Sequence, residues 1–186
     1  MQIEVRGVVE TLRTVPAPRF SPGEVCRLLA GAEVNPSTLA PYLHFSKGRY
    51  TRNMIFRNEL FELLALCWAP HTQSPIHNHA NQLCWLSIQQ GALRLENFHS
   101  LDGPGPGESI RLVSSGGLAR AEAGCLDLQQ GDDGIHRVSN PFDEPAVSLH
   151  VYSRPYDSCL AYNLEKQSAC ELPLRYWSVE GKLVMQ

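Results

Sequence analysis

Short runs of apolar residues, many of them alternating with polar ones, dominate the chain from Arg49 onward. They are separated by Gly, Pro, Asn and Asp and include "YTRNMIF", "LFELLALCW", "QLCWLSI", "AVSLHVYS" and "LPLRYWSV". Runs of this length and spacing are typical of β-strands. Ten such runs in about 130 residues predict an all-β sandwich or barrel over about 49–186. The Gly/Pro-rich stretch "SLDGPGPGES" (100–109) has the length of an exposed hairpin loop rather than of a domain linker.

Helix signals are confined to the first quarter of the chain. Ser21-Pro-Gly-Glu24 combines a capping box with proline at the first helical position, and Asn35-Pro36 repeats the signal. These signals predict a short helical segment over about 15–45 that precedes the barrel. A chain of 186 residues is long enough for one sizeable core, so we expect a single domain over 1–186.

The composition is that of an ordinary globular protein, with 43% hydrophobic and 19% charged residues and a formal net charge of −3. No basic run is present, which argues against nucleic-acid binding. Charged residues interrupt every apolar run near the N-terminus, and no run approaches eighteen apolar residues, so no signal peptide or membrane span is predicted. We expect a cytoplasmic protein that acts as a monomer.

The six cysteines are far apart and form no C-x-x-C pair. A chain of this size needs no disulfide framework, and free cysteines are commonly buried. We therefore expect reduced, mostly buried thiols.

Three histidines are candidate metal ligands. His77 and His79 are two residues apart in "SPIHNHANQLC", and on a strand both would project to the same side. This spacing alone is a weak signal, because two polar residues can also line a solvated strand face. His136 lies farther along, in "GIHRVSN". Two histidines on one strand and a third on a later one is an arrangement that jelly-roll barrels use to bind a metal. With zinc such a site would activate water, whereas with iron(II) it would bind a thiolate beside dioxygen.

The segments "HNHANQLCWLSIQQG" and "GIHRVSN" resemble the two cupin motifs, with Cys84 where many cupins carry a glutamate ligand. Together with "RYTRN", "LALCWAPHTQSPIHNHANQLC" and "EPAVSLHVYSRPYDSC", they resemble the cysteine dioxygenases and related thiol dioxygenases. Those proteins are small cupins that hold a non-haem iron with three histidines. The resemblance implies a jelly-roll barrel and Fe(II) bound by His77, His79 and His136.

The resemblance also implies roles for other residues. Arg52 matches the arginine that pairs with the substrate carboxylate, and Tyr50 matches a residue that borders the substrate. Ser148, His150 and Tyr152 lie on one face of a predicted strand and match a hydrogen-bonded relay.

In animal-type members of the family, the cysteine at the position of Cys84 forms a thioether with the tyrosine at the position of Tyr152. The alternative is that Cys84 is an ordinary buried thiol.

Arg154 departs from the cysteine-specific members, which usually have proline directly after the serine that matches Ser153. Arginine here resembles relatives that oxidise mercaptocarboxylates, yet those relatives usually replace the substrate arginine with glutamine, and this chain keeps Arg52. If Arg154 turns into the pocket, it would contact a second anionic group of the substrate. If it points to solvent, the pocket keeps the cysteine-specific layout.

The resemblance therefore predicts an iron dioxygenase that adds both atoms of O2 to a small thiol. L-Cysteine, oxidised to cysteine sulfinate, is the first choice, and mercaptosuccinate or 3-mercaptopropionate is the alternative. The rival interpretations are a non-enzymatic cupin that senses a thiol or a metal, and a zinc hydrolase or isomerase on the same fold.

Overall fold

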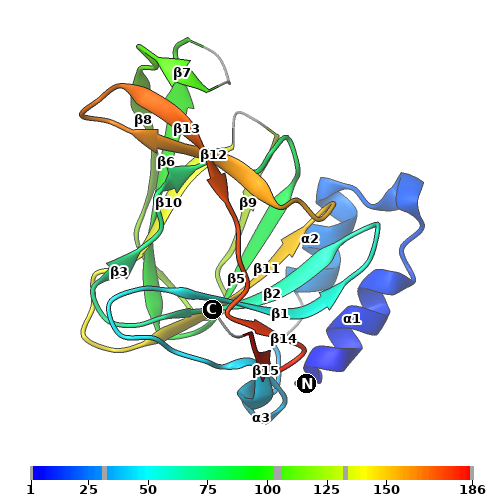
Figure 1. Ribbon diagram of the computed structural model, residues 1–186. Helices are drawn as coiled ribbons and strands as arrows, with labels where there is room; N and C mark the ends of the chain where they lie inside the picture. Colours follow the sequence, from blue (N-terminus) through cyan, green and yellow to red (C-terminus); the bar gives the residue numbers. More distant parts are fainter. Residues whose placement is uncertain (1, 31–32, 103–105, 132–133, 185–186) are drawn as a thin grey trace.

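The computed structural model describes residues 2–30, 33–102, 106–131 and 134–184, and two β-sheets make up most of it (Figure 1). The first sheet contains, in spatial order, β15 (Lys182–Leu183), β14 (Ser178–Val179), β1 (Thr51–Arg57), β2 (Glu62–Trp68), β11 (Ala146–Tyr152), β5 (Cys84–Gln90) and β9 (Leu126–Gln129). The second contains β7 (Gly107–Glu108), β13 (Ser168–Pro173), β12 (Ser158–Asn163), β4 (Ile76–His77), β10 (Ile135–Asn140), β6 (Ala92–Ser100) and β8 (Leu112–Glu122), with β3 (Thr72–Gln73) paired to β10. The prediction of a cupin jelly roll is confirmed.

The strand predictions hold for most runs, and the clearest exception is "LPLRYWSV". Its first two residues end β13 and its last two form β14, while 174–177 lie outside any strand. Pro173 cannot donate a hydrogen bond to a neighbouring strand, and the sheet pairing ends there. The predicted hairpin loop does connect two paired strands, since Ser100 of β6 lies opposite Leu112 of β8; residues 103–105 of that loop lie outside the described residues.

The helical segment begins earlier than predicted. Its elements are α1 (Val5–Arg13), η1 (Ala17–Arg19), α2 (Pro22–Ala30), α3 (Pro36–Leu39) and η2 (Ala40–Tyr42). The predicted start near residue 15 is wrong because α1 has no capping signal: its N-cap is Glu4, which makes no side-chain cap hydrogen bond. What stabilises α1 is an apolar stripe of four buried residues, Val5, Val8, Val9 and Leu12. The predicted cap at Asn35 is confirmed, because its side chain accepts a hydrogen bond from the Ser37 amide at 3.1 Å.

The central strands of the first sheet, β2 and β11, are buried on both faces. Leu63 and Ala65 pack against the helical segment, whereas Leu64 and Leu66 of the same strand face the barrel interior. Figure 1 shows α1 and α2 on the side of this sheet that faces away from the second sheet. Burial on two faces explains why the strands read as nearly continuous apolar runs.

Gly91 permits the tight turn between β5 and β6. Its φ is +71°, and a Cβ at this position would lie only 2.6 Å from the Pro145 carbonyl oxygen. Only glycine fits both constraints. This turn joins β6 to β5, the strand that begins at Cys84.

Candidate metal centre

Three histidine side chains converge inside the barrel. His77 of β4 lies directly opposite His136 of β10, and His79 follows two residues after His77. The ring centroids are 4.8–5.2 Å apart, and the potential ligand atoms lie within 4.8 Å of one another. They form the one group of three or more potential metal ligands found in the described part of the chain.

The local backbone explains why His77 and His79 face the same way. β4 itself ends at His77, but the pairing with β12 continues because Asn78 donates its amide proton to the Leu160 carbonyl at 3.2 Å. The Asn78 side chain in turn accepts from the Leu160 amide at 2.9 Å. The chain therefore stays extended through Asn78, which preserves the alternation expected of a strand.

The three imidazoles are neutral and suited to bind a metal. Burial lowers the pKa of His77 to about 4, although the Pro75 carbonyl opposes this shift. Burial and the neighbouring histidines lower the pKa of His79 and His136 well below the usual range. Nδ1 of His77 lies 3.0 Å from the Pro75 carbonyl oxygen, an acceptor, so Nδ1 carries the proton and Nε2 is left with its lone pair.

The buried nitrogens of this group fit a bound cation. Both ring nitrogens of His79 and Nδ1 of His136 are buried and make no hydrogen bond of normal geometry within the described residues. Leaving buried polar atoms without partners is costly unless something else occupies them. Three neutral nitrogen donors match first-row transition metals such as iron(II) and zinc rather than magnesium or calcium.

A line of hydrogen-bonding side chains lies on the interior face of β11. Trp68 Nε1 donates to Ser148 Oγ at 2.8 Å, and this oxygen lies 2.9 Å from His150 Nε2. On the other side of the ring, Nδ1 lies 3.3 Å from the Tyr152 hydroxyl oxygen. Burial, with the nearby charge of Arg52, lowers the pKa of His150 to about 3, so this ring is also neutral. The predicted set Ser148, His150 and Tyr152 is therefore brought together.

Cys84 is adjacent to Tyr152. The two residues lie directly opposite each other on β5 and β11, and Cys84 Sγ is 3.8 Å from the same His150 Nδ1 that faces the Tyr152 hydroxyl. Both side chains are buried, and burial raises the pKa of each. Cross-strand neighbours of this kind have Cβ atoms about 5 Å apart, which is within reach of a side-chain bond.

Arg52 lies next to this group, with its guanidinium 5.7 Å from the centre of the Tyr152 ring. The residue is 9% exposed, and its Nε atom has no hydrogen-bond partner among the described residues. Burial alone would lower the pKa of Arg52, but the hydroxyl groups of nearby tyrosines and the Glu62 carboxylate raise it. Tyr50 stacks on Trp68 with ring centroids 4.7 Å apart, which places it beside both Arg52 and the hydrogen-bonded line.

Arg154 lies two residues beyond β11 and its side chain is exposed. It makes no ion pair within the described residues. Its position agrees with the outward-facing alternative, and a role for Arg154 in substrate choice stays a prediction.

Sequence reasoning missed Glu62, a fully buried carboxylate opposite Tyr152 on β2. Glu62 accepts a hydrogen bond from Tyr176, and Arg57 donates to the same Tyr176 hydroxyl at 2.5 Å. Burial raises the pKa of Glu62, whereas Tyr176 and Arg52 lower it. A charged residue in the apolar run "LFELLALCW" was the only sequence signal, and it did not identify the partners.

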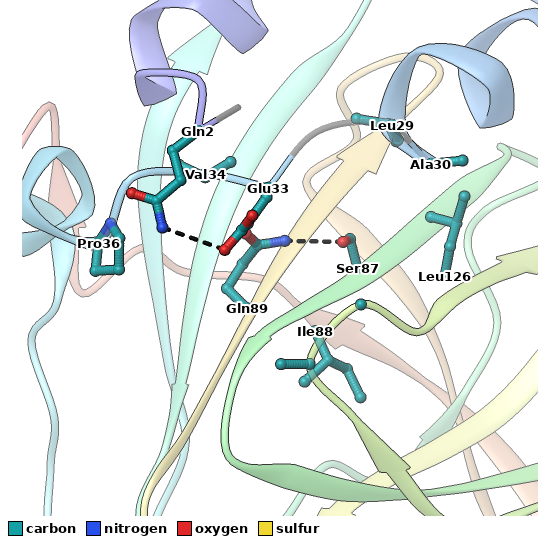
Figure 2. Close-up of a pocket in the computed structure, with 12 residues that line it drawn as sticks. Gln2, Leu29, Ala30, Glu33, Val34, Pro36, Ser87, Ile88, Gln89 and Leu126 are labelled. Atoms are coloured by element: carbon teal, nitrogen blue, oxygen red, sulfur yellow. Dashed lines mark hydrogen bonds between the residues drawn. The ribbon is translucent and has the colours of Figure 1, made fainter.

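A separate cavity of about 350 Å³ lies between the helical segment and the first sheet. Figure 2 shows its polar contacts: Gln2 donates to Glu33 at 3.2 Å, and Gln89 donates to Ser87 at 2.8 Å. Among the described residues, its lining includes no histidine and no cysteine. Ser87 and Gln89 lie on the face of β5 opposite the one that carries Cys84.

The chain is similar to known proteins over most of its length. The family model for cysteine dioxygenase type I matches residues 11–165. Cysteine dioxygenase type 1 from Rattus norvegicus is 37% identical over 142 residues, which cover 75% of this chain and 68% of the rat protein. The Danio rerio protein of the same name is 32% identical over 165 residues, covering 86% and 78%.

Among solved structures, a protein from Thermus thermophilus superimposes with a TM-score of 0.50 at 13% identity, covering 66% of this chain and 97% of that protein. This likeness concerns the fold alone. No described helix is both long and apolar enough to span a bilayer. The family model and the animal relatives show that the chain belongs to the cysteine dioxygenase family and is an oxidoreductase of the thiol dioxygenase type.

Proposed function

We propose that the protein is an Fe(II) dioxygenase that converts a small thiol and O2 into the corresponding sulfinic acid, with L-cysteine as the first-choice substrate. The observation that carries this proposal is the group of three neutral histidines beside a buried arginine and a buried tyrosine in one barrel interior. Membership of the cysteine dioxygenase family supports both the metal and the substrate. The reaction balances as one thiol plus one O2 giving one sulfinic acid.

His77, His79 and His136 would hold the iron. When bound, Fe(II) supplies a place where a thiolate and dioxygen can react side by side. Because all three ligands are neutral, they leave the full charge of the ion to attract the anionic thiolate. The chain itself contributes the ligands, the orientation of the substrate and the exclusion of water.

Arg52 binds the substrate carboxylate in this proposal. Its guanidinium is permanently charged and planar, so it can form two parallel hydrogen bonds to a carboxylate. The unpartnered Nε and the 9% exposure are consistent with a donor reserved for a ligand. Fixing the carboxylate would fix the thiol end of a small amino acid relative to the histidines.

The line from Trp68 to Tyr152 determines where one proton points. Trp68 can only donate, so Ser148 accepts from it and directs its own hydroxyl proton to His150 Nε2. The proton of the neutral His150 ring is then on Nδ1, facing the Tyr152 oxygen. Tyr152 is left with its own O–H free to donate toward the substrate, and its raised pKa keeps that proton in place.

A thioether between Cys84 and Tyr152 is a further part of the proposal. Its formation removes the Sγ proton and one ring hydrogen of the tyrosine, and the two electrons pass with two protons to dioxygen. The direct cross-strand pairing of the two residues supports it. If the bond does not form, Cys84 serves as a buried packing residue.

Oxygen uptake by the iron-loaded protein tests the proposal. We expect sulfinate formation with matching O2 consumption for cysteine in a panel that also contains cysteamine, 3-mercaptopropionate and mercaptosuccinate. If a mercaptocarboxylate is the best substrate, the proposed reaction stands but L-cysteine is not the preferred substrate. No uptake with any thiol would favour a sensor, and activity that requires zinc would favour a hydrolase or isomerase. A monomeric, cytoplasmic protein stays a prediction.

A further inference from the structure

An open cleft of about 500 Å³ leads from the surface to Arg52 and Tyr50. Its lining residues are Arg49, Tyr50, Arg52, Pro75, Leu172, Pro173, Leu174, Arg175 and Trp177. Three of them are arginines, and none of the described lining residues is acidic. The cleft is therefore positively charged from its buried end at Arg52 to its exposed rim at Arg49 and Arg175.

The cleft adjoins the histidine group. Pro75 is one of its lining residues, and the carbonyl oxygen of Pro75 accepts the proton of His77 Nδ1. Arg52, at the inner end, packs against Tyr152. A small molecule held by Arg52 could thus have its thiol beside the histidines while another part of it extends outward into the cleft.

The segment that carries Arg175 is held in place at both ends. The Leu174 amide donates to the Asp157 carbonyl at 2.8 Å, and the Trp177 amide donates to the Arg52 carbonyl at 2.7 Å. Arg49 lies over the Trp177 ring, 4.5 Å from its centroid. These contacts tie the rim of the cleft to the same residue that forms its inner end.

Arg175 has no acidic partner within the described residues, although its guanidinium is permanently charged. Arg52 likewise has an unpartnered, buried Nε. One monocarboxylic thiol can satisfy Arg52 but leaves the outer arginine unused. A thiol with a second anionic group can contact both ends of the cleft.

We infer that the outer half of this cleft is a subsite for a second anionic group, and that the enzyme accepts dicarboxylic thiols through Arg52 and Arg175. The inference rests on the proposed function, because it needs the thiol to reach the metal centre. It extends that function from a monocarboxylic amino acid to thiols of higher negative charge. It also places the second anionic contact at Arg175 rather than at the exposed Arg154.

The first test compares two substrates that differ by one carboxylate. Mercaptosuccinate carries the second carboxylate, and 3-mercaptopropionate lacks it. In Arg175→Ala we expect kcat/KM for mercaptosuccinate to fall by about tenfold and that for 3-mercaptopropionate by less than about twofold. Arg6→Ala removes an equal charge from an exposed position of α1 and serves as the matched control. An equal loss for both thiols, no loss, or no oxidation of mercaptosuccinate while cysteine is oxidised would overturn the inference.

The second test does not need turnover. Succinate has both carboxylates but no thiol, and its binding to the iron-loaded protein can be followed by the fluorescence change of Trp177, with Trp177→Phe identifying the signal. We expect the Kd for succinate to rise about fivefold in Arg175→Ala and to stay constant in Arg6→Ala. An unchanged Kd in Arg175→Ala contradicts the subsite. If no thiol is oxidised but succinate still binds through Arg175, the proposed function fails while the anion subsite stands.

Discussion

The two faces of β11 perform different tasks with alternate residues of one strand. Val147, Leu149 and Val151 project away from the interior, and the last two pack against the helical segment. Ser148 and His150 project into the barrel beside the histidine group. Both faces are buried, so exposure does not distinguish them. What differs is the kind of contact that each face requires. Side chains on the helix-facing side need close apolar packing, whereas those on the interior side need hydrogen bonds of fixed direction.

The largest effect should come from removing one of the three histidines that would hold the iron in the barrel interior. In His136→Ala the iron content should fall from about one per chain to near zero, because two remaining imidazoles bind a first-row ion weakly. Thiol oxidation should be lost with it. Metal analysis and oxygen uptake on the same preparation measure both. Stoichiometric zinc in the wild type, without iron-dependent activity, would contradict the assignment.

A change on the outer face should have the opposite signature. Leu149→Ala removes a 4% exposed side chain from the helix-facing core and should lower the free energy of unfolding by about 2–5 kcal/mol. The folded fraction should keep its kcat/KM. Ser148→Ala, one residue away, leaves Trp68 Nε1 and His150 Nε2 without their hydrogen-bond partner. It should lower the free energy of unfolding by about 2 kcal/mol and, unlike Leu149→Ala, also lower kcat/KM. Urea unfolding gives the free energy of unfolding of the two variants, and steady-state kinetics give their kcat/KM. The same change in kcat/KM for both variants would contradict the proposed difference between the two faces.

Arg52 tests whether the interior face recognises a carboxylate. Arg52→Ala should reduce kcat/KM for cysteine by at least about thirtyfold, because the substrate carboxylate would be left without its charged partner. Cysteamine, which lacks that carboxylate, provides the control and should lose less than about threefold. An equal loss for both substrates would mean that Arg52 supports Tyr152 instead.

Replacing Cys84, which lies on β5 opposite Tyr152, should have a smaller effect. Where the thioether has formed, intact mass should be about two daltons below the sequence mass. Cys84→Gly should abolish this difference and lower turnover several-fold without eliminating it. Protein that stays entirely at the unmodified mass after many turnovers would leave Cys84 with a packing role.

The smallest effect is expected for Arg154, whose side chain is exposed at the end of the strand. Arg154→Ala should leave the ratio of kcat/KM values for cysteine and mercaptosuccinate unchanged within about twofold, as is usual for exposed positions. A preference for mercaptosuccinate that disappears in this variant would show that the side chain turns inward.

The grouping of the three histidines was predictable from the sequence because His77 and His79 are close along the chain and His136 lies in a recognisable segment. The strands were predictable because their apolar runs are short and separated by turn residues. The cleft was not predictable, because Arg52 and Arg175 are far apart in sequence. They line the same cleft only in the folded chain, where the Trp177 amide donates to the Arg52 carbonyl. α1 was missed since tertiary burial, rather than a capping signal, stabilises it.

The register that sets Cys84 opposite Tyr152 has a consequence for the lifetime of the protein. A covalent bond between these residues would close a loop of about 68 residues. A cross-link of that span lowers the entropy of the unfolded chain and so raises the free energy of unfolding by about 4 kcal/mol in the chain-entropy treatment. If turnover drives the bond, each molecule would become harder to unfold as it works. Molecules that have turned over substrate would then stay folded longer than molecules that have not. The melting temperature of a sample would rise with the fraction of molecules that carry the thioether.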